Sequence, residues 1–553
     1  MGVRGAAAAA AGVLAAAFLA GCGGGGSAAS GNADAVLTVG MPNGPLTQNN
    51  NLLLSSSPAN SLGYGYMIYE PLVMTNSIRP ADPGKAWLAA RWDWSANFTR
   101  LVLTVRDNVT WSDGKPMTGA DVAYTFELLK KHPALNSSGI PFGDISASGN
   151  RVTLTFPSSQ FVNRNKILNQ AVLPEHQWAA MKNPETDTVP NPVGTGPYTI
   201  KSATPQAVTL TERSSYWQQL PAVKEIRYTS YSDNDTQSAA LATGACDWSF
   251  VFLPNAKTVF LDKDPAHFKM WFPPTLAVHG LWLNNQEAPF NDVVLRRAVN
   301  LAVNRHDVFT QGEGGYFYPE VRSVTGLPLP AGEPFLAPAF RGKNAAVDVE
   351  GAKKLLTAAG YSYAGTTLRD RSGKPVTLEM PVPSGWSDYV ADLEIIKDNL
   401  AAIGITATVD RLDQNVWNTN VDTGRFGGTL HWTNAGATPY DLYESAMDGA
   451  LLKPVGTGGV AGNWGRFSDE AATNALRQYA GASDEGTRSK ALEAMQQIMA
   501  DQVPMIPLVA VNDGGEYSTA HWTGWADDQN QYAGLQPNKM NALQIVSNLK
   551  PAG

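Results

Sequence analysis

The chain has 553 residues, of which 43% are hydrophobic and 16% charged, and its formal net charge is −8. This length exceeds what one hydrophobic core supports and predicts two or three domains. The composition is that of a globular protein and excludes a disordered chain. The mildly acidic balance argues against nucleic acid or anionic lipid as the main partner.

Residues 1–21 have the pattern of a secretion signal. Arg4 gives the basic start, an apolar stretch covers 6–18, and Cys22 follows Leu19-Ala20-Gly21. The apolar run is too short to span a membrane, which needs about 20 residues, so a cleaved signal is expected. The residues around Cys22 resemble the lipobox of bacterial lipoproteins, which implies a lipidated Cys22 and a body anchored to the outer face of the cell membrane. The Gly- and Ser-rich segment 22–34 then forms a flexible tether.

The sequence shows no motif for catalysis, a cofactor or a metal. No G-x-S-x-G elbow is present, and the seven histidines are scattered, without the spacing of a metal site such as H-E-x-x-H. There are two cysteines. If Cys22 carries lipid, Cys246 has no partner, so we expect no disulfide and a buried, apolar environment for Cys246.

The first third of the chain is predicted to form strands and one capped helix. Residues 36–39 predict a strand, and 101–105 alternate in the manner of a half-buried strand. Thr118 is placed to cap a helix, with Asp121 as the capping acid three residues later. Residues 151–156 alternate again. We therefore predict an α+β unit of antiparallel hairpins over about 61–186.

The second half of the chain has a different pattern of predicted helices and strands. Asp348 is expected to cap a helix that Gly360 ends. A strand over 376–382, a helix from Ser387 to Gly404 and a strand over 405–409 then form a βαβ crossover, so the two strands should be parallel neighbours.

A separate α/β lobe is predicted over about 273–511. Proline-rich segments at Pro273-Pro274 and at 504–507 mark its expected edges.

Five blocks, in order along the chain, resemble the family 5 solute-binding proteins of ABC importers, the class of oligopeptide- and dipeptide-binding proteins. The most specific block contains Trp111-Ser112-Asp113-Gly114-Lys115-Pro116, which is similar to the family's turn before a capped helix. The blocks lie at 89–122, 192–198 (followed by Tyr216-Trp217), 283–302, 352–361 and 503–508.

The resemblance implies an α/β, two-lobed, periplasmic-binding-protein-like fold (type II, cluster C) with an inserted α+β subdomain. Lobe I would comprise 35–60, 187–272 and 512–553, with the insertion at 61–186, and lobe II would comprise 273–511. Ligand would bind between lobes that close by a hinge motion. The closed monomer would deliver its ligand to a membrane permease and its ATPase, without enzymatic activity of its own and without a cofactor or nucleic acid.

The default ligand of such a protein is an oligopeptide. In peptide-binding relatives a segment resembling W-x-A-D-Y-x-D-P carries an acid that pairs with the peptide's amino terminus, as a buried charge requires. The matching stretch here, 431–440, keeps Trp432 but not the aspartate. Asp441 or Asp413 could replace it, so peptide binding stays open.

The alternative ligand is a β-linked oligosaccharide such as a cello-oligosaccharide. The Gly-x-Thr-Pro-Tyr form of this stretch resembles sugar-binding relatives, and aromatic faces suit sugar rings. Residues 244–250 match a stretch that lines the cleft in such relatives, although core packing explains their aromatic residues equally well. A nickel complex, or an enzyme on the same scaffold, is a third alternative. The ligand-binding residues expected are Trp248, Phe250, Trp386, Trp432, Asn434, Tyr440 and Asp441.

Overall fold

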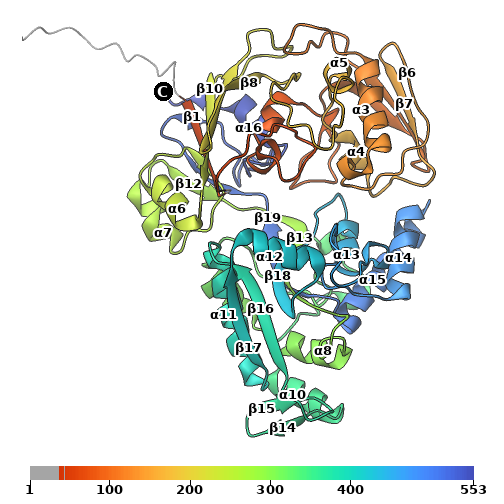
Figure 1. The fold of residues 1–553 in the computed structure, drawn as a ribbon, viewed down its shortest axis with the longest axis vertical. Helices are drawn as coiled ribbons and strands as arrows, with labels where there is room; N and C mark the ends of the chain where they lie inside the picture. The colour runs from red at the N-terminus through yellow and green to blue at the C-terminus, as the bar shows by residue number, and fades with distance from the viewer. Residues whose placement is uncertain (1–35, 43) are drawn as a thin grey trace, which may run out of the picture.

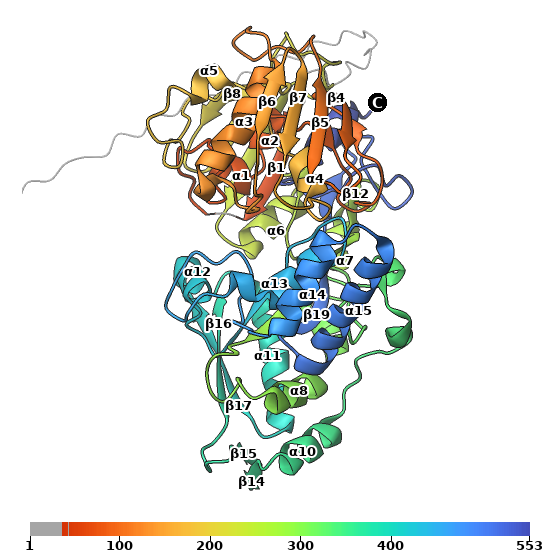
Figure 2. The same ribbon diagram turned by 90° about the vertical axis from the view of Figure 1, so that its right-hand side faces the viewer.

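The computed structural model describes residues 36–42 and 44–553. Two bodies lie one above the other along the longest axis, as Figures 1 and 2 show. The predicted signal peptide, the lipidated Cys22 and the tether over 22–34 lie outside the described residues.

The upper body is built on a seven-stranded sheet with the order β12-β20-β11-β1-β10-β9-β8. Its first strand, β1 (Val36–Pro42), confirms the strand predicted at 36–39 and pairs in parallel with β10 (Glu225–Tyr231). The other strands come from the middle and the end of the chain, so distant segments share one sheet. They are β8 (Tyr198–Ala203), β9 (Ala207–Glu212), β11 (Trp248–Ser249), β12 (Phe268–Trp271) and β20 (Gly515–Ser518).

A four-stranded antiparallel sheet with the order β4-β5-β7-β6 lies beside it and carries helix α3 (Gly119–Lys131). The predicted capping box is present, because the Asp121 carboxylate accepts the Thr118 N–H at 2.8 Å. In the strand at 100–105 the predicted alternation holds in part: Thr104 on the outer face is partly exposed, but Val102 on the same face is buried, so the prediction of a half-buried strand was wrong at Val102. The strands are β4 (Ala89–Trp94), β5 (Arg100–Val105), β6 (Ile145–Ser148) and β7 (Arg151–Thr155).

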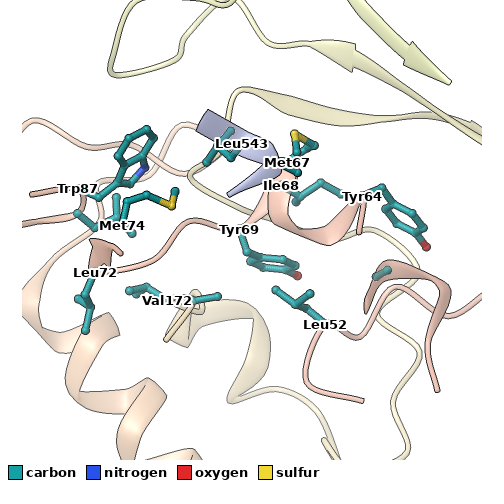
Figure 3. Close-up of a cluster of buried hydrophobic side chains, with 14 of the residues drawn as sticks. Leu52, Tyr64, Met67, Ile68, Tyr69, Leu72, Met74, Trp87, Val172 and Leu543 are labelled. Carbon is teal, nitrogen blue, oxygen red and sulfur yellow. The ribbon is translucent and has the colours of Figure 1, made fainter. Parts of the chain in front are cut away.

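One hydrophobic core joins this small sheet to the seven-stranded one. Figure 3 shows Trp87 and Val172 gathered with Leu543 of the C-terminal helix α16 (Ala542–Asn548). The buried surface fixes the inserted unit to the upper body, because separation would expose all of these side chains to water. Other members of this core labelled in Figure 3 are Leu52, Tyr64, Met67, Ile68, Tyr69, Leu72 and Met74.

The lower body has a three-stranded antiparallel sheet with the order β18-β13-β19. The predicted βαβ crossover is confirmed next to it, because β16 and β17 pair in parallel with α11 between them in the chain. Helix α10 (Val349–Ala358) is capped by Asp348 as predicted, and Gly360, at φ 90°, follows its end. The bounds are β13 (Pro274–Leu283), β18 (Gly428–Trp432), β19 (Ile506–Asn512), β16 (Thr377–Pro383), α11 (Ser387–Ala402) and β17 (Thr406–Leu412).

The chain passes between the two bodies at two adjacent places. The first lies between β12 and β13, at Phe272-Pro273, and the second between β19 and β20, at Asp513-Gly514. The two crossings touch, since the Asp513 N–H donates to the Pro273 carbonyl at 3.0 Å. Of the predicted edges, only Pro273-Pro274 lies at a crossing. Pro507 lies inside β19, an outer strand of its sheet, where a missing N–H is tolerated.

From the places where the strands and the chain crossings lie, we propose that the division into lobes expected from the sequence holds. Lobe I then comprises 35–60, 187–272 and 512–553, with the inserted subdomain at 61–186, and lobe II comprises 273–511.

Candidate functional site

A chain of touching aromatic rings leads from lobe I into lobe II. Phe250, just after β11, lies 5.3 Å from Phe317 between ring centroids, and Phe317 lies 4.4 Å from Tyr318. Tyr318 in turn lies 4.2 Å from His279 on β13. The sequence-predicted Phe250 is half-buried at the start of this path.

The path ends at a group of rings that we call the platform: Trp386, Tyr389, Trp417, His431 and Trp432. Trp386 is the N-cap residue of α11 and lies 5.2 Å from Tyr389 and 6.3 Å from Trp432. His431 stacks on Trp432 at 4.1 Å and 22°. Trp432 is 38% exposed and is the one aromatic side chain among the exposed large hydrophobic residues of the described chain. The structure therefore brings two of the predicted residues, Trp386 and Trp432, to one surface.

The two histidines of this region, His279 and His431, are uncharged at neutral pH. His279 Nδ1 lies 2.5 Å from the Tyr389 hydroxyl. Burial, with a smaller effect from His431, lowers the pKa of His279 to about 3, and burial lowers the pKa of His431 to about 4. His279 Nε2 is buried without a hydrogen-bond partner within 36–42 and 44–553. Neutral rings of this kind can hydrogen-bond a hydroxyl or an amide without pairing a charge.

A carboxyl group adjoins the platform where the lobes meet. Asp388, in the first turn of α11, is 8% exposed, and burial raises its pKa to about 6. Asn234 of α6 (Asn234–Ala242) reaches across from lobe I, with its Nδ2 3.3 Å from the Ser387 hydroxyl and 3.5 Å from Asp388 Oδ1. Deeper in lobe II, burial and mutual repulsion raise the pKa of Glu313, and burial raises the pKa of Asp392, which favours protonated carboxyls there.

Trp248 does not belong to this surface. Its side chain is fully buried in lobe I, its indole N–H donates to the Leu535 carbonyl at 2.8 Å, and its ring meets Trp525 edge-on at 5.6 Å. Core packing, the alternative explanation for Trp248, accounts for all of these contacts. We therefore leave Trp248 out of the proposed site.

The remaining predicted residues lie on or before helix α13 (Tyr440–Met447), with other partners. Asn434 is exposed, and its backbone N–H donates to the Ser445 hydroxyl. Tyr440 is buried and stacks on Tyr479 at 6.0 Å. Asp441 is buried, with its Oδ1 2.6 Å from Lys166 Nζ.

Asp413, the other acid considered for a peptide's amino terminus, is exposed and caps helix α12 (Gln414–Thr423). The acid beside the platform is Asp388, which sequence reasoning missed although it lies two residues after Trp386. His279 and Tyr389 were also missed. A lone histidine in an apolar strand gives no signal of its neighbours in space.

Two surface hollows lie away from the platform, one in the inserted subdomain and one where that subdomain joins lobe I. Their volumes are about 550 and 620 Å³, and Met181 and Lys182 line both. In the described part of the chain, no group of three or more His, Cys, Asp or Glu side chains is placed to hold a metal ion. None of the helices described has both the length and the apolar character of a membrane span.

Comparison with known families gives one match that covers more than half of the chain. Residues 85–449 match the model described as bacterial extracellular solute-binding proteins, family 5 middle.

Three individual proteins are similar over most of their length. The nickel-binding periplasmic protein of Escherichia coli is 26% identical, over 68% of this chain and 71% of its own. A mannohexaose-bound periplasmic oligopeptide-binding protein of an ABC transporter from Thermotoga maritima superposes with a TM-score of 0.81 at 23% identity, over 93% of this chain and 98% of its own. The oligopeptide-binding protein AppA of Bacillus subtilis, in complex with a nonapeptide, gives a TM-score of 0.75 at 18% identity, over 94% and 99%.

Proposed function

The chain belongs to family 5 of the bacterial extracellular solute-binding proteins, the substrate-binding proteins of ABC transporters, and from that membership we propose that it captures a short neutral oligomer between its two lobes. The permease and its ATPase would then import the oligomer. Relatives of this chain are transport binding proteins, and we propose the same role here, without catalysis and as a monomer.

A β-linked oligosaccharide is the ligand that the platform supports best. The observation that carries this choice is the 38% exposed Trp432, backed by Trp386 and the stacked His431. The apolar face of a sugar ring packs well on such a surface. Beside it lies neutral His279, whose buried Nε2 has no hydrogen-bond partner among the described residues. This ranking of an oligosaccharide above an oligopeptide reverses the expectation from the sequence, which placed oligopeptides first.

An oligopeptide is the second candidate, and Asp388 is the observation that favours it. The carboxyl lies beside the platform at the lobe boundary, and an ammonium group nearby would lower its raised pKa and pair with it. The nonapeptide complex of the B. subtilis protein shows that this fold holds peptides of that length.

A thermal-shift screen distinguishes the two candidates. The chain is melted with cello- and manno-oligosaccharides, with mixed peptides, and with a nickel–histidine complex. A ligand that binds only the folded state adds about 2.7 kcal/mol of stability at a hundredfold excess over its Kd. A shift with sugars alone supports the first candidate. A shift with peptides alone replaces it by the second, and a shift with neither argues against oligomer capture.

We also propose that the protein is anchored through a lipidated Cys22. A location outside the cytoplasm is supported by the similar periplasmic protein of E. coli and by the description of the family as extracellular. The anchor itself rests on the sequence pattern around Cys22.

A further inference from the structure

A second contact between the lobes lies away from the crossing strands. Helix α4 (Arg164–Leu168) of the inserted subdomain faces α13 of lobe II, and Lys166 Nζ lies 2.6 Å from Asp441 Oδ1. In Figure 1, α4 and α13 lie to the right of β12 and β19, the strands next to the chain crossings. Ile167 belongs to the core of lobe I and Leu442 to a core of lobe II, so the ion pair joins two separate hydrophobic clusters.

The residues just before Lys166 are docked on lobe II as well. Phe161 meets the ring of Tyr479 edge-on at 6.2 Å, and the Arg488 guanidinium lies 4.4 Å from the Phe161 ring centroid. Val162 is 5% exposed and counts among the buried residues of the lobe II cluster. These contacts hold α4 at a fixed position over α13.

The two charged side chains at this contact differ in their exposure to solvent. The Asp441 side chain is fully buried, whereas that of Lys166 is 27% exposed. Burial lowers the pKa of Lys166, but the carboxylates of Asp441 and Glu444 raise it by more, so the lysine stays cationic. Within the described chain no hydrogen bond from elsewhere reaches the Asp441 carboxylate. Without the lysine, this arrangement of the lobes would hold a buried and uncompensated charge.

We propose that Lys166 and Asp441 form a closure latch that stabilises the closed arrangement of the lobes in the absence of ligand. The inference rests on the two-lobed capture proposed above. Opening the lobes about the crossings at Phe272-Pro273 and Asp513-Gly514 separates α4 from α13 and returns both charges to water. The latch also fills the Asp441 site with the protein's own ammonium group. Asp441 is then not free for a ligand's amine, which agrees with a neutral ligand.

Spin-label distances in the ligand-free chain test the latch. Labels at Ser138→Cys in the inserted subdomain and Ser483→Cys in lobe II, both exposed positions, report the separation of the lobes. The full chain is used with Cys22→Ser, so that the remaining native thiol is the buried Cys246. We expect the wild type to show a population with a short distance between the labels. In Lys166→Met and in Asp441→Asn the ratio of this population to the open one should fall about tenfold, which corresponds to about 1.4 kcal/mol. Lys130→Met, which removes an exposed lysine of the same subdomain, should leave it unchanged.

Salt separates a latch from a merely structural contact. Raising NaCl from 50 to 500 mM should shrink the short-distance population of the wild type, because Lys166 is partly exposed and screened, but not that of Lys166→Met. A wild-type chain without a short-distance population overturns the latch, as does a population that neither substitution alters or one with no salt dependence. The measurement needs no ligand, so a failed ligand screen and a failed latch are told apart.

Discussion

Trp432 lies directly opposite His279 in the pairing of β18 with β13, and their ring centroids are 6.3 Å apart at 61°. Residues opposite each other in antiparallel strands point to the same face of the sheet. The register therefore places an exposed indole beside a buried imidazole that titrates near pH 3. This combination of an apolar face with a neutral hydrogen-bonding group is the core of the proposed site.

Trp432→Ala should weaken ligand binding about tenfold or more, a loss of about 1.4 kcal/mol. The stacking surface is lost, while the stability of the fold changes little because the side chain is 38% exposed. Isothermal titration with the oligomer found in the screen measures the affinity. Val416→Ala, on the adjacent helix α12, removes a 49% exposed apolar residue outside the platform and serves as control. Equal affinities of wild type and Trp432→Ala would remove Trp432 from the site.

Once Asp388→Asn has removed the neighbouring carboxyl, whose pKa is about 6, binding of a neutral sugar through the platform should be nearly independent of pH between about 5.5 and 8. The pKa values of His279 and His431, about 3 and 4, keep both rings neutral throughout this range. The affinity of a cello- or manno-oligosaccharide is measured across the range, with the melting temperature of the free protein as control. An affinity that changes with a midpoint near the ordinary pKa of histidine, about 6.5, would show that these rings are less shielded than their burial indicates.

Asp388→Asn should stabilise the ligand-free protein at pH 7.5 and have little effect at pH 4. The pKa of Asp388 is raised from 3.8 to about 6 by burial, so the folded state keeps a proton that the unfolded state releases. Stability from this group is therefore present at low pH and is lost between pH 4 and 6, by at most about 3 kcal/mol. Urea unfolding at the two pH values measures the difference.

Asp398→Asn, at an exposed position on the same helix, is the matched control for Asp388→Asn. If Asp388→Asn destabilises the chain equally at both pH values, the carboxyl has a hydrogen-bonding role instead. Loss of peptide binding in the same variant would support the oligopeptide candidate.

Gly514→Ala should destabilise the crossing between the lobes by about 1–3 kcal/mol. A Cβ at Gly514 would lie 2.3 Å from the Trp271 carbonyl oxygen and 2.5 Å from Phe272 Cα, and both are backbone atoms of the adjacent crossing. Thermal unfolding tests this, with Gly481→Ala as control because a Cβ there meets nothing within 4 Å. A melting temperature equal to that of the wild type would mean that the two crossings can separate freely.

Cys22→Ser should release the protein from the membrane fraction into the soluble fraction, because the acyl chains provide the proposed anchor. Cell fractionation followed by immunoblotting measures the distribution. Cys246→Ser is the control, since Cys246 is buried and far along the chain from the signal. Persistence of Cys22→Ser in the membrane fraction would disprove the anchor.

Local sequence determined the elements whose cause is local. The capping box of Thr118 and Asp121 and the helix end before Gly360 depend on neighbouring residues alone, so the sequence predicted them. The parallel pairing of β16 with β17 also followed, because a helix between two strands leaves few other connections.

Tertiary structure alone decided which aromatic residues are available to a ligand. Trp248 and Trp432 are the same residue type and were predicted for the same role, but one is buried against Trp525 and the other is exposed opposite His279. Burial depends on which distant strands pair and in which register, and these contacts join residues that are more than a hundred positions apart. Likewise, the partner of Asp441 is Lys166, from a subdomain far earlier in the chain. The sequence determines the chemistry of a side chain, whereas its neighbours and its solvent exposure are determined only when the two lobes are assembled.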